Sequence, residues 1–138
     1  MATLMQKLQI SLFSGAVFTA VNLPQIYELT NKLSGNQLYN TATKCPTFAG
    51  ILVHTLVYFV LTYLSMWGAD ASVGQKLRNT IYGTLIFFFV SNPVTYQLTG
   101  RLTGGLTADQ NGCPTLYGVL MHAVVYVTLL FLVMFLPN

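Results

Sequence analysis

Apolar residues dominate four stretches of the chain, and each stretch is long enough to cross a lipid bilayer as a helix. The clearest are Phe48–Trp67 and Leu116–Leu136, which contain no Asp, Glu, Lys or Arg and match the roughly 20 residues that a spanning helix needs. Leu8–Tyr27 and Leu77–Tyr96 are weaker because they include Ser, Thr, Asn or Gln. Such groups are costly against lipid, so we expect them to face neighbouring helices.

The same pattern occurs twice. At an offset of 68, Cys45–Met66 and Cys113–Met134 share 11 of their 22 residues, and at an offset of 69 residues 6–33 match residues 75–102. A repeat of this strength predicts that the chain is built from two copies of one unit. We expect a single membrane domain, 1–138, with repeat 1 at 5–67, a linker at 68–74 and repeat 2 at 75–138.

The predicted fold class is an all-α integral membrane protein whose four transmembrane helices form a parallel tandem repeat of two two-helix hairpins. Two crossings per repeat return the chain to its starting side, so both copies have the same orientation. Both termini and the linker then lie on one side of the membrane, and the two Cys-Pro-Thr turns lie on the other. Each side carries three Lys or Arg residues, so the distribution of positive charge leaves the orientation open.

Proline interrupts the first helix of each predicted hairpin. Pro24 and Pro93 fall late in these helices, where the missing N–H and the ring should kink or end them. We expect Asn to satisfy the freed carbonyl group. The residues that follow can form a short interfacial helix, with Tyr27 and Tyr96 at headgroup depth.

The residues shared by the two copies of the second helix fall on one stripe when placed at 100° per residue. We interpret the stripe as a packed face where the repeats meet, with glycines that let helices approach closely. It comprises Gly50, His54, Val57, Tyr58, Leu61 and Leu64 in the first copy, and Gly118, His122, Val125, Tyr126, Leu129 and Leu132 in the second.

His54 and His122 are the only histidines, and each lies about 13 Å along its helix from the preceding cysteine, close to the midplane. An ionisable group at this depth is a candidate functional site. Three readings are open: a neutral imidazole hydrogen-bonded to a neighbouring helix, a proton or ion pathway, and a metal site. Tyr58 and Tyr126, four residues further on, are available to the same network. We favour the structural reading because no acidic residue lies within any span.

Cys45 and Cys113 are counterparts in the two repeats. They can form a disulfide where their side of the membrane is oxidising and their Cα atoms come within about 7 Å. Two free thiols at helix starts are the alternative.

Composition narrows the function classes. The chain is 54% hydrophobic and 7% charged, whereas soluble domains have about 25% charged residues. So few basic residues argue against a nucleic-acid partner. Neither cysteine belongs to a CxxC motif, and phosphate-binding, dinucleotide-binding, HExxH and GxSxG motifs are all absent. We therefore predict no enzymatic activity, no cofactor and no metal.

The combination of [NS]xPxxYxLTxxL with a downstream CPTxxGxLxHxxVY, present in both halves, resembles small four-span membrane proteins of large double-stranded DNA viruses, such as those of the chlorella-virus type. The resemblance covers nearly the whole chain. It implies a structural role in the membrane inside an icosahedral capsid, and it assigns no catalytic residue.

The expected function is that of a structural membrane protein that links a viral internal membrane to capsid components. The expected partners are the lipid bilayer and other capsid or membrane proteins, and a homo-oligomer is left open. The alternative function is a small channel or transporter with a proton or ion pathway through His54 and His122. A four-helix membrane oxidoreductase is disfavoured, because such enzymes need paired cysteines and each repeat has one.

Overall fold

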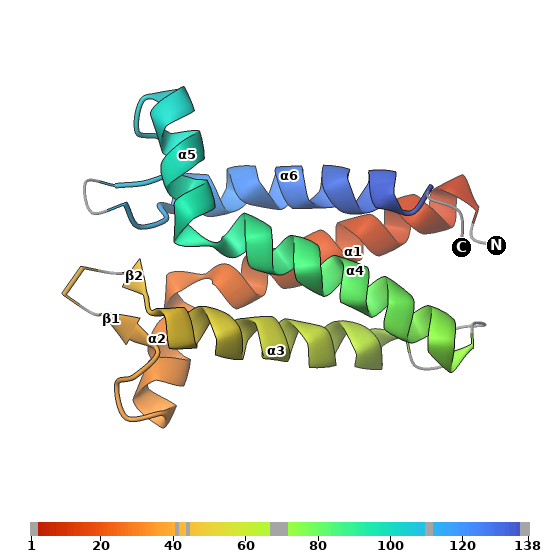
Figure 1. Cartoon of the computed structure of the whole chain (residues 1–138), viewed down its shortest axis with the longest axis horizontal. Helices are drawn as coiled ribbons and strands as arrows, with labels where there is room; N and C mark the ends of the chain where they lie inside the picture. The colour runs from red at the N-terminus through yellow and green to blue at the C-terminus, as the bar shows by residue number, and fades with distance from the viewer. Residues whose placement is uncertain (1–2, 41, 44, 67–71, 110–111, 136–138) are drawn as a thin grey trace.

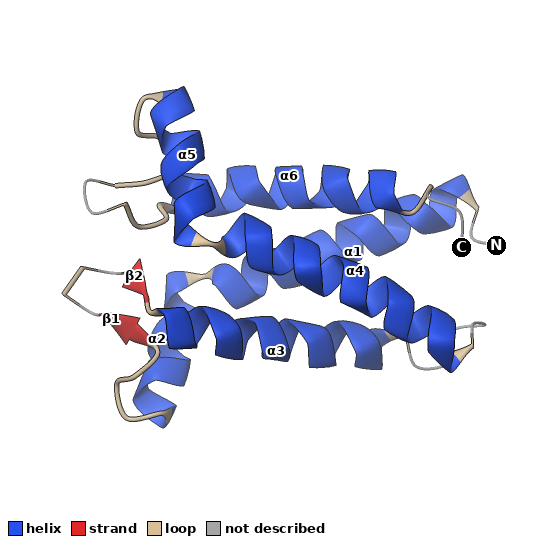
Figure 2. Cartoon of the chain, in the orientation of Figure 1, coloured by secondary structure: helices blue, strands red, loops and turns tan. Residues whose placement is uncertain are grey.

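The computed structural model describes residues 3–40, 42–43, 45–66, 72–109 and 112–135, and within these ranges the chain is all-helical apart from one small hairpin. Four long helices run along the length of the molecule, and two short helices stand across it at one end (Figures 1 and 2). The helices are α1 (Leu4–Asn22), α2 (Pro24–Leu33), α3 (Phe48–Ser65), α4 (Val73–Ser91), α5 (Pro93–Thr103) and α6 (Leu116–Val133). The antiparallel strands β1 (Tyr39–Asn40) and β2 (Cys45–Pro46) form the hairpin.

The prolines set the corners between the long and the short helices. Leu23 is extended, so α1 ends at Asn22 and Pro24 begins α2, where a missing N–H costs nothing. Pro93 begins α5 in the same way after Asn92. The predicted spans Leu8–Tyr27 and Leu77–Tyr96 are therefore wrong in their bounds, because the tyrosines belong to the crossing helices α2 and α5.

The linker predicted at 68–74 lies partly outside the described residues, since 67–71 are not described. Its last part is helical instead, because α4 begins at Val73. The Ser72 side chain accepts a hydrogen bond from the Gln75 amide and caps this helix, as serine does at an N-cap.

The most extensive helix contacts join the two halves of the chain. α1 packs most closely against α6, and α3 packs most closely against α4, while the contacts of α1 with α3 and of α4 with α6 are smaller. The same pairing is seen in hydrogen bonds to sulfur. The Ser11 hydroxyl donates to the Met134 thioether, and the Thr80 hydroxyl donates to that of Met66, each at 3.8 Å.

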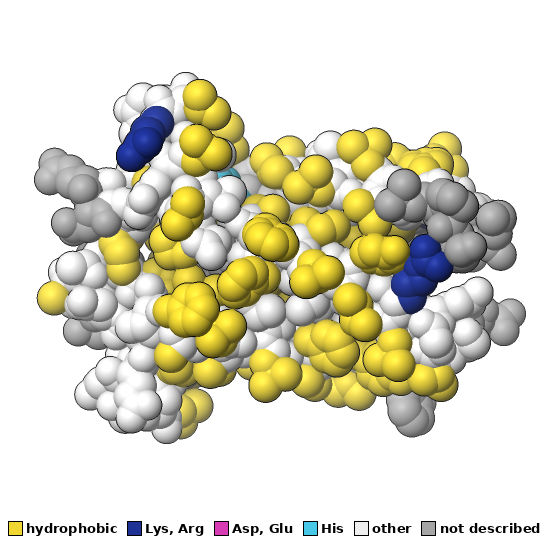
Figure 3. All heavy atoms as spheres, in the orientation of Figure 1, with side chains coloured by type: hydrophobic (Ala, Val, Ile, Leu, Met, Phe, Trp, Pro, Cys, Tyr) yellow, Lys and Arg dark blue, Asp and Glu magenta, His cyan; other side chains and the backbone are white. Residues whose placement is uncertain are grey.

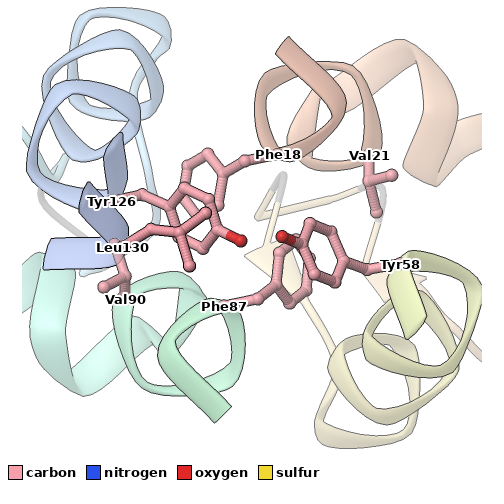
Figure 4. Close-up of a cluster of buried hydrophobic side chains, with 7 residues drawn as sticks. All are labelled: Phe18, Val21, Tyr58, Phe87, Val90, Tyr126 and Leu130. Carbon is pink, nitrogen blue, oxygen red and sulfur yellow. The ribbon is translucent and has the colours of Figure 1, made fainter. Parts of the chain in front are cut away.

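Four aromatic rings fill the centre of the bundle (Figure 4). Phe18 of α1 stacks on Tyr126 of α6 at 4.9 Å between ring centroids, and Tyr58 of α3 stacks on Phe87 of α4 at 4.5 Å. The two phenylalanines meet edge to face at 5.4 Å and the two tyrosines at 5.8 Å. This geometry is favourable for aromatic pairs, and it links all four long helices at one level.

The outer surface of the bundle is apolar. Among the described residues, three helices are long and apolar enough to cross a membrane: α1, α3 and α6. Figure 3 shows hydrophobic side chains spread along the length of the bundle, with basic side chains only near its ends on this face. An apolar surface of this extent is typical of a protein that lies in lipid.

Candidate functional site

A histidine joins α3 to the corner between α1 and α2. His54 is 1% exposed, and its Nδ1 lies 2.8 Å from the carbonyl oxygen of Val21. That carbonyl belongs to the last turn of α1, where carbonyl groups lack a partner within the helix. On the other side of the ring, Nε2 lies 2.8 Å from the Thr30 hydroxyl of α2. The imidazole also stacks on the ring of Tyr27, with 3.7 Å between centroids.

The second half repeats this arrangement. His122 of α6 places Nδ1 2.9 Å from the carbonyl oxygen of Val90 and Nε2 2.8 Å from the Thr99 hydroxyl. Its ring stacks on Tyr96 at 3.8 Å. We call these two sets the first and second histidine clusters. Histidine thus binds a carbonyl of the last turn before each proline corner. The expected donor, asparagine, acts in the first half as well, where the Asn22 amide nitrogen donates to the Phe18 carbonyl and to the Ser91 hydroxyl.

The hydrogen-bond partners determine the tautomer of each histidine. A carbonyl oxygen can only accept, so Nδ1 carries the hydrogen and donates it to Val21 or Val90. In the neutral ring Nε2 then accepts from the threonine hydroxyl. Both nitrogens of both rings are therefore occupied within their own half of the chain. The histidines do not form a facing pair, which is the arrangement that a metal site or a direct relay between them would need.

Tyr58 and Tyr126 lie apart from the histidine clusters. Their hydroxyl groups point into the centre of the bundle in Figure 4. Tyr58 is hydrogen-bonded to Ser14 of α1, and Tyr126 donates to the carbonyl oxygen of Gly83 of α4 at 3.4 Å. The expectation that these tyrosines share a network with the histidines is wrong, because each phenol reaches across to a different helix.

Gly50 and Gly118 allow a loop, rather than a helix, to come close. A Cβ atom at Gly50 would collide with the backbone oxygen of Leu38, and one at Gly118 would collide with that of Thr107. Both carbonyls belong to the segment that returns from the short helix to the long one. The same oxygens accept the amides of Thr47 and Thr115 at 3.1 Å, so the close approach fixes where α3 and α6 begin.

The prediction that the whole stripe is a packed face is correct for half of its residues and wrong for the other half. Gly50, His54 and Tyr58 are buried, and so are their counterparts Gly118, His122 and Tyr126. The remaining stripe residues are all exposed: Val57, Leu61, Leu64, Val125, Leu129 and Leu132. The buried face of α3 includes Ile51 and Thr62 instead. The face is turned because α3 packs mainly on α4 and α1, and only little on its counterpart α6.

A disulfide joins the two halves at the end of the bundle opposite the termini. Cys45 in β2 and Cys113 before α6 are bonded, with their Cα atoms 5.1 Å apart. Cys113 is fully buried. Thr47 and Thr115 follow two residues later, and each accepts the amide of the third helical residue, Gly50 or Gly118. The threonine of the Cys-Pro-Thr motif is therefore the helix cap.

The surface above the first histidine cluster is closed by Tyr39 of β1, whose ring stacks on Tyr27 at 5.8 Å. Burial raises the pKa of the Tyr39 phenol, and the nearby carboxylates of Glu28 and Asp109 raise it further. An ionised phenol is therefore disfavoured here. The second half has Ala108 at the corresponding place.

Sequence reasoning did not identify the threonines that bind the histidines. Thr30 and Thr99 stand in the shared YxLTxxL segment, and this identity between copies was the available signal. Its meaning depends on the corner at each proline, which folds the threonine back towards the next helix. Within the described ranges, no group of three His, Cys, Asp or Glu side chains could hold a metal ion.

Comparison with known proteins identifies no relative. No protein-family model matches the chain, and no curated protein or solved structure matches it. The functional argument therefore depends on the geometry of this chain.

Proposed function

We propose that this chain is a non-enzymatic structural membrane protein in which α1, α3, α4 and α6 all span the bilayer. α4 has 19 residues, as many as α1, and is about 28 Å long at the rise of an α-helix. It packs against both α3 and α6. Its basic residues, Lys76 and Arg78, lie in its first two turns, at the end of the bundle that holds the termini (Figure 1). This placement suits a fourth span.

We also propose that the bundle is a parallel tandem repeat with a pseudo-two-fold axis along its length. Support comes from contacts between residues that are counterparts at an offset of 68 or 69. Such self-paired contacts are what a two-fold axis produces. They are the disulfide Cys45–Cys113, the ring pairs Phe18–Phe87 and Tyr58–Tyr126, and the hydrogen bond between Asn22 and Ser91 at 3.1 Å.

The observation that carries the structural role is the use of both imidazole nitrogens in each histidine cluster. Each ring ties three helices of one half together. An unpaired carbonyl in a membrane is costly, and the histidine removes that cost at the proline corner. The clusters therefore hold the short helices at a fixed angle to the bundle and have no nitrogen left over for a substrate.

We propose an orientation as well. A disulfide persists on the oxidising side of a membrane, so the end with Cys45 and Cys113 faces that side and the termini face the other. A single cysteine added at residue 2 tests this, with Cys45 and Cys113 already oxidised. We expect a membrane-impermeant maleimide to label it in inside-out vesicles and to leave it unlabelled in sealed right-side-out vesicles. Labelling in the right-side-out vesicles would overturn the orientation.

The proposed location is the internal membrane of a virion, where the loops of the chain contact capsid components. This location is supported by the sequence resemblance to viral four-span proteins. Purified particles offer the test: the chain should stay with the membrane after alkaline carbonate washing and should cosediment with capsid shells. Its absence from particles, together with its presence in a cellular membrane, would overturn the location.

Proton flux in liposomes tests the structural function against the alternative of a transporter. We expect no flux above that of empty liposomes, with either the native chain or the double variant His54→Asn/His122→Asn. A flux that the native chain supports and the double variant abolishes would overturn the structural proposal, because asparagine keeps hydrogen bonding but does not titrate.

A further inference from the structure

Each of the two short helices has an apolar side that is exposed in the fold. Four leucines, two in each helix, are more than half exposed: Leu29 and Leu33 in α2, and Leu98 and Leu102 in α5. Residues four positions apart lie on the same side of a helix, so each pair forms one continuous side. The buried Tyr27 and Tyr96 precede these pairs by two residues, which is about 200° of helical rotation. The apolar sides therefore point away from the core of the chain.

A polar side adjoins the apolar side in both helices. It carries Gln97 and Arg101 in α5, and the corresponding Glu28 and Lys32 in α2, all of them exposed. Figure 3 shows hydrophobic side chains on the side of α5 that faces the other end of the bundle, and a basic side chain on the side away from it. The apolar side thus faces the belt of the bundle, and the charge faces outward. A helix that lies in the headgroup layer of a membrane is divided in this way.

The apolar sides of the short helices continue the apolar surface of the bundle. Both helices stand across the same end, and they leave the bundle in opposite directions (Figure 1). The long helices α3 and α6 begin at this end with Phe48 and Leu116, which are 65% and 59% exposed. Lipid that covers the first turns of α3 and α6 therefore also meets α2 and α5. This continuity favours the boundary between headgroups and acyl chains as the partner of the two apolar sides.

The short helices are held firmly where they leave the bundle. His54 binds the Thr30 hydroxyl of α2, and His122 binds the Thr99 hydroxyl of α5, both at 2.8 Å. Each of these threonines directly follows an exposed leucine. The disulfide joins the two halves at the same end. These bonds resist any swing of the short helices, so a force between them and the lipid is passed on to the whole bundle.

The opposite end of the bundle has no crossing helix among the residues that the structure describes. α1 begins there at Leu4 and α6 ends there at Val133, and both run along the bundle (Figure 1). The crossing helices have 10 and 11 residues, so they are about 15 and 16 Å long at the rise of an α-helix. The chain is therefore wider at the end that holds the disulfide than at the end that holds the termini.

We propose that α2 and α5 insert into one leaflet at the boundary between headgroups and acyl chains, and that the chain thereby bends the membrane. Helices in this layer take up area in the leaflet at the Cys45–Cys113 end and none in the other leaflet. The membrane reduces the mismatch by curving so that the Cys45–Cys113 side is convex. The inference deepens the proposed function and rests on it, because only a chain whose bundle spans the bilayer places both helices in a defined leaflet.

Reconstitution of the whole chain into large vesicles of dioleoylphosphatidylcholine tests the bending. This lipid has no net charge, so attraction to basic residues does not contribute. As the protein-to-lipid ratio rises, we expect electron cryomicroscopy to show vesicles of decreasing diameter and then narrow tubules. Vesicles that keep the diameter of protein-free vesicles at the highest ratio would overturn the proposal.

Two double variants test the helices. Leu98→Ser/Leu102→Ser and Leu29→Ser/Leu33→Ser change only exposed side chains, and each should lose about half of the added curvature because two helices contribute. Either pair serves if the other fails to fold, which thermal unfolding and the disulfide report. Leu4→Ser/Met5→Ser is the matched control, since it removes two exposed apolar side chains at the opposite end. It should not reduce the curvature, and an equal loss in the control would contradict the role of α2 and α5.

A cysteine at the apolar side of α5 separates lipid from a second copy of the chain as its partner. In the variant Leu98→Cys, Cys45 and Cys113 are already bonded to each other. We expect this chain to remain a monomer when the reconstituted vesicles are oxidised. Efficient formation of a disulfide-linked dimer would show that another copy covers this side, and would overturn the assignment to lipid.

Small vesicles test which side is convex. With the single cysteine at residue 2, a membrane-impermeant maleimide should label a smaller fraction of chains in small sonicated vesicles than in large vesicles, because the termini then lie inside. Equal fractions would overturn the stated direction of bending. Alkaline carbonate washing of the same vesicles separates this inference from the proposed function. A chain that stays in the membrane without bending it contradicts the inference alone, whereas a chain that washes off contradicts the spanning bundle.

Discussion

The two corners where the short helices leave the bundle are alike at depth and different at the surface. At depth, His54 and His122 bind a freed carbonyl, a threonine and a tyrosine ring with distances that agree within 0.1 Å. Nearer the surface, Asn31 and Tyr39 close the first corner, whereas Gly100 and Ala108 leave the second open.

This difference follows from the free-energy cost of leaving a backbone polar group unpaired at each depth. In the proposed membrane location, an unpaired carbonyl at this depth has no water to bind, so each half needs a donor such as histidine at its proline corner. Near the headgroups, water or a ligand can satisfy a backbone amide. The surface layer can therefore differ between the halves without loss of the fold.

The largest effect is expected from breaking the link that holds the two corners together. The variant Cys45→Ser/Cys113→Ser opens a loop of 68 residues, whose closure is worth at most about 4 kcal/mol. The actual loss should be smaller because the unfolded chain keeps its helices in the micelle. Unfolding by a denaturing detergent measures this loss of stability. The native chain under reducing conditions is the control. An unchanged transition in both samples would contradict the prediction.

The next effect is expected where the loop crosses the long helix in each half. Gly50→Ala and Gly118→Ala each force a methyl group against a backbone carbonyl that cannot rotate away, and overpacking of this kind costs about 2–3 kcal/mol. Both variants should unfold at a lower concentration of denaturing detergent than the native chain. Gly74→Ala is the matched control, since its added Cβ meets only the Ser72 hydroxyl at 3.9 Å.

The histidine clusters should be equal in strength. His54→Ala and His122→Ala each leave a buried carbonyl without a donor, at a cost of about 2 kcal/mol. The midpoint temperature of thermal unfolding in detergent should fall by the same amount in both variants. A loss in only one half would show that the clusters are not equivalent, whatever their geometry.

The sequence was sufficient to predict the long apolar helices and the corners at Pro24 and Pro93, because length, hydropathy and proline chemistry act locally. It identified His54 and His122 as the polar residues at depth. It did not identify their partners. Thr30 and the Val21 carbonyl come into reach only after the proline turns the chain, and that turn depends on three helices packing together.

The sequence pattern also could not predict which helices pack against each other. The stripe of shared residues predicts a packed face where the repeats meet, but it does not say that α3 packs mainly on α4 and α6 mainly on α1. Identity between copies marks positions with the same surroundings, and it does not say which helix provides them. The shared leucines, Leu61 and Leu129 among them, are exposed, which is what the proposed lipid surroundings would favour in both copies.

The smallest effect bears directly on the difference between the corners. Asn31→Ala removes the oxygen that the amides of Leu38 and Tyr39 share, and it should cost about 1 kcal/mol, since water can replace part of the bond near the surface. Asn31→Asp keeps an acceptor at the same place and should cost less. The midpoint temperatures of thermal unfolding in detergent compare the two variants. If both variants match the native chain, the asparagine does not hold the first corner closed, and the open second corner would then be no more than a looser version of the same turn.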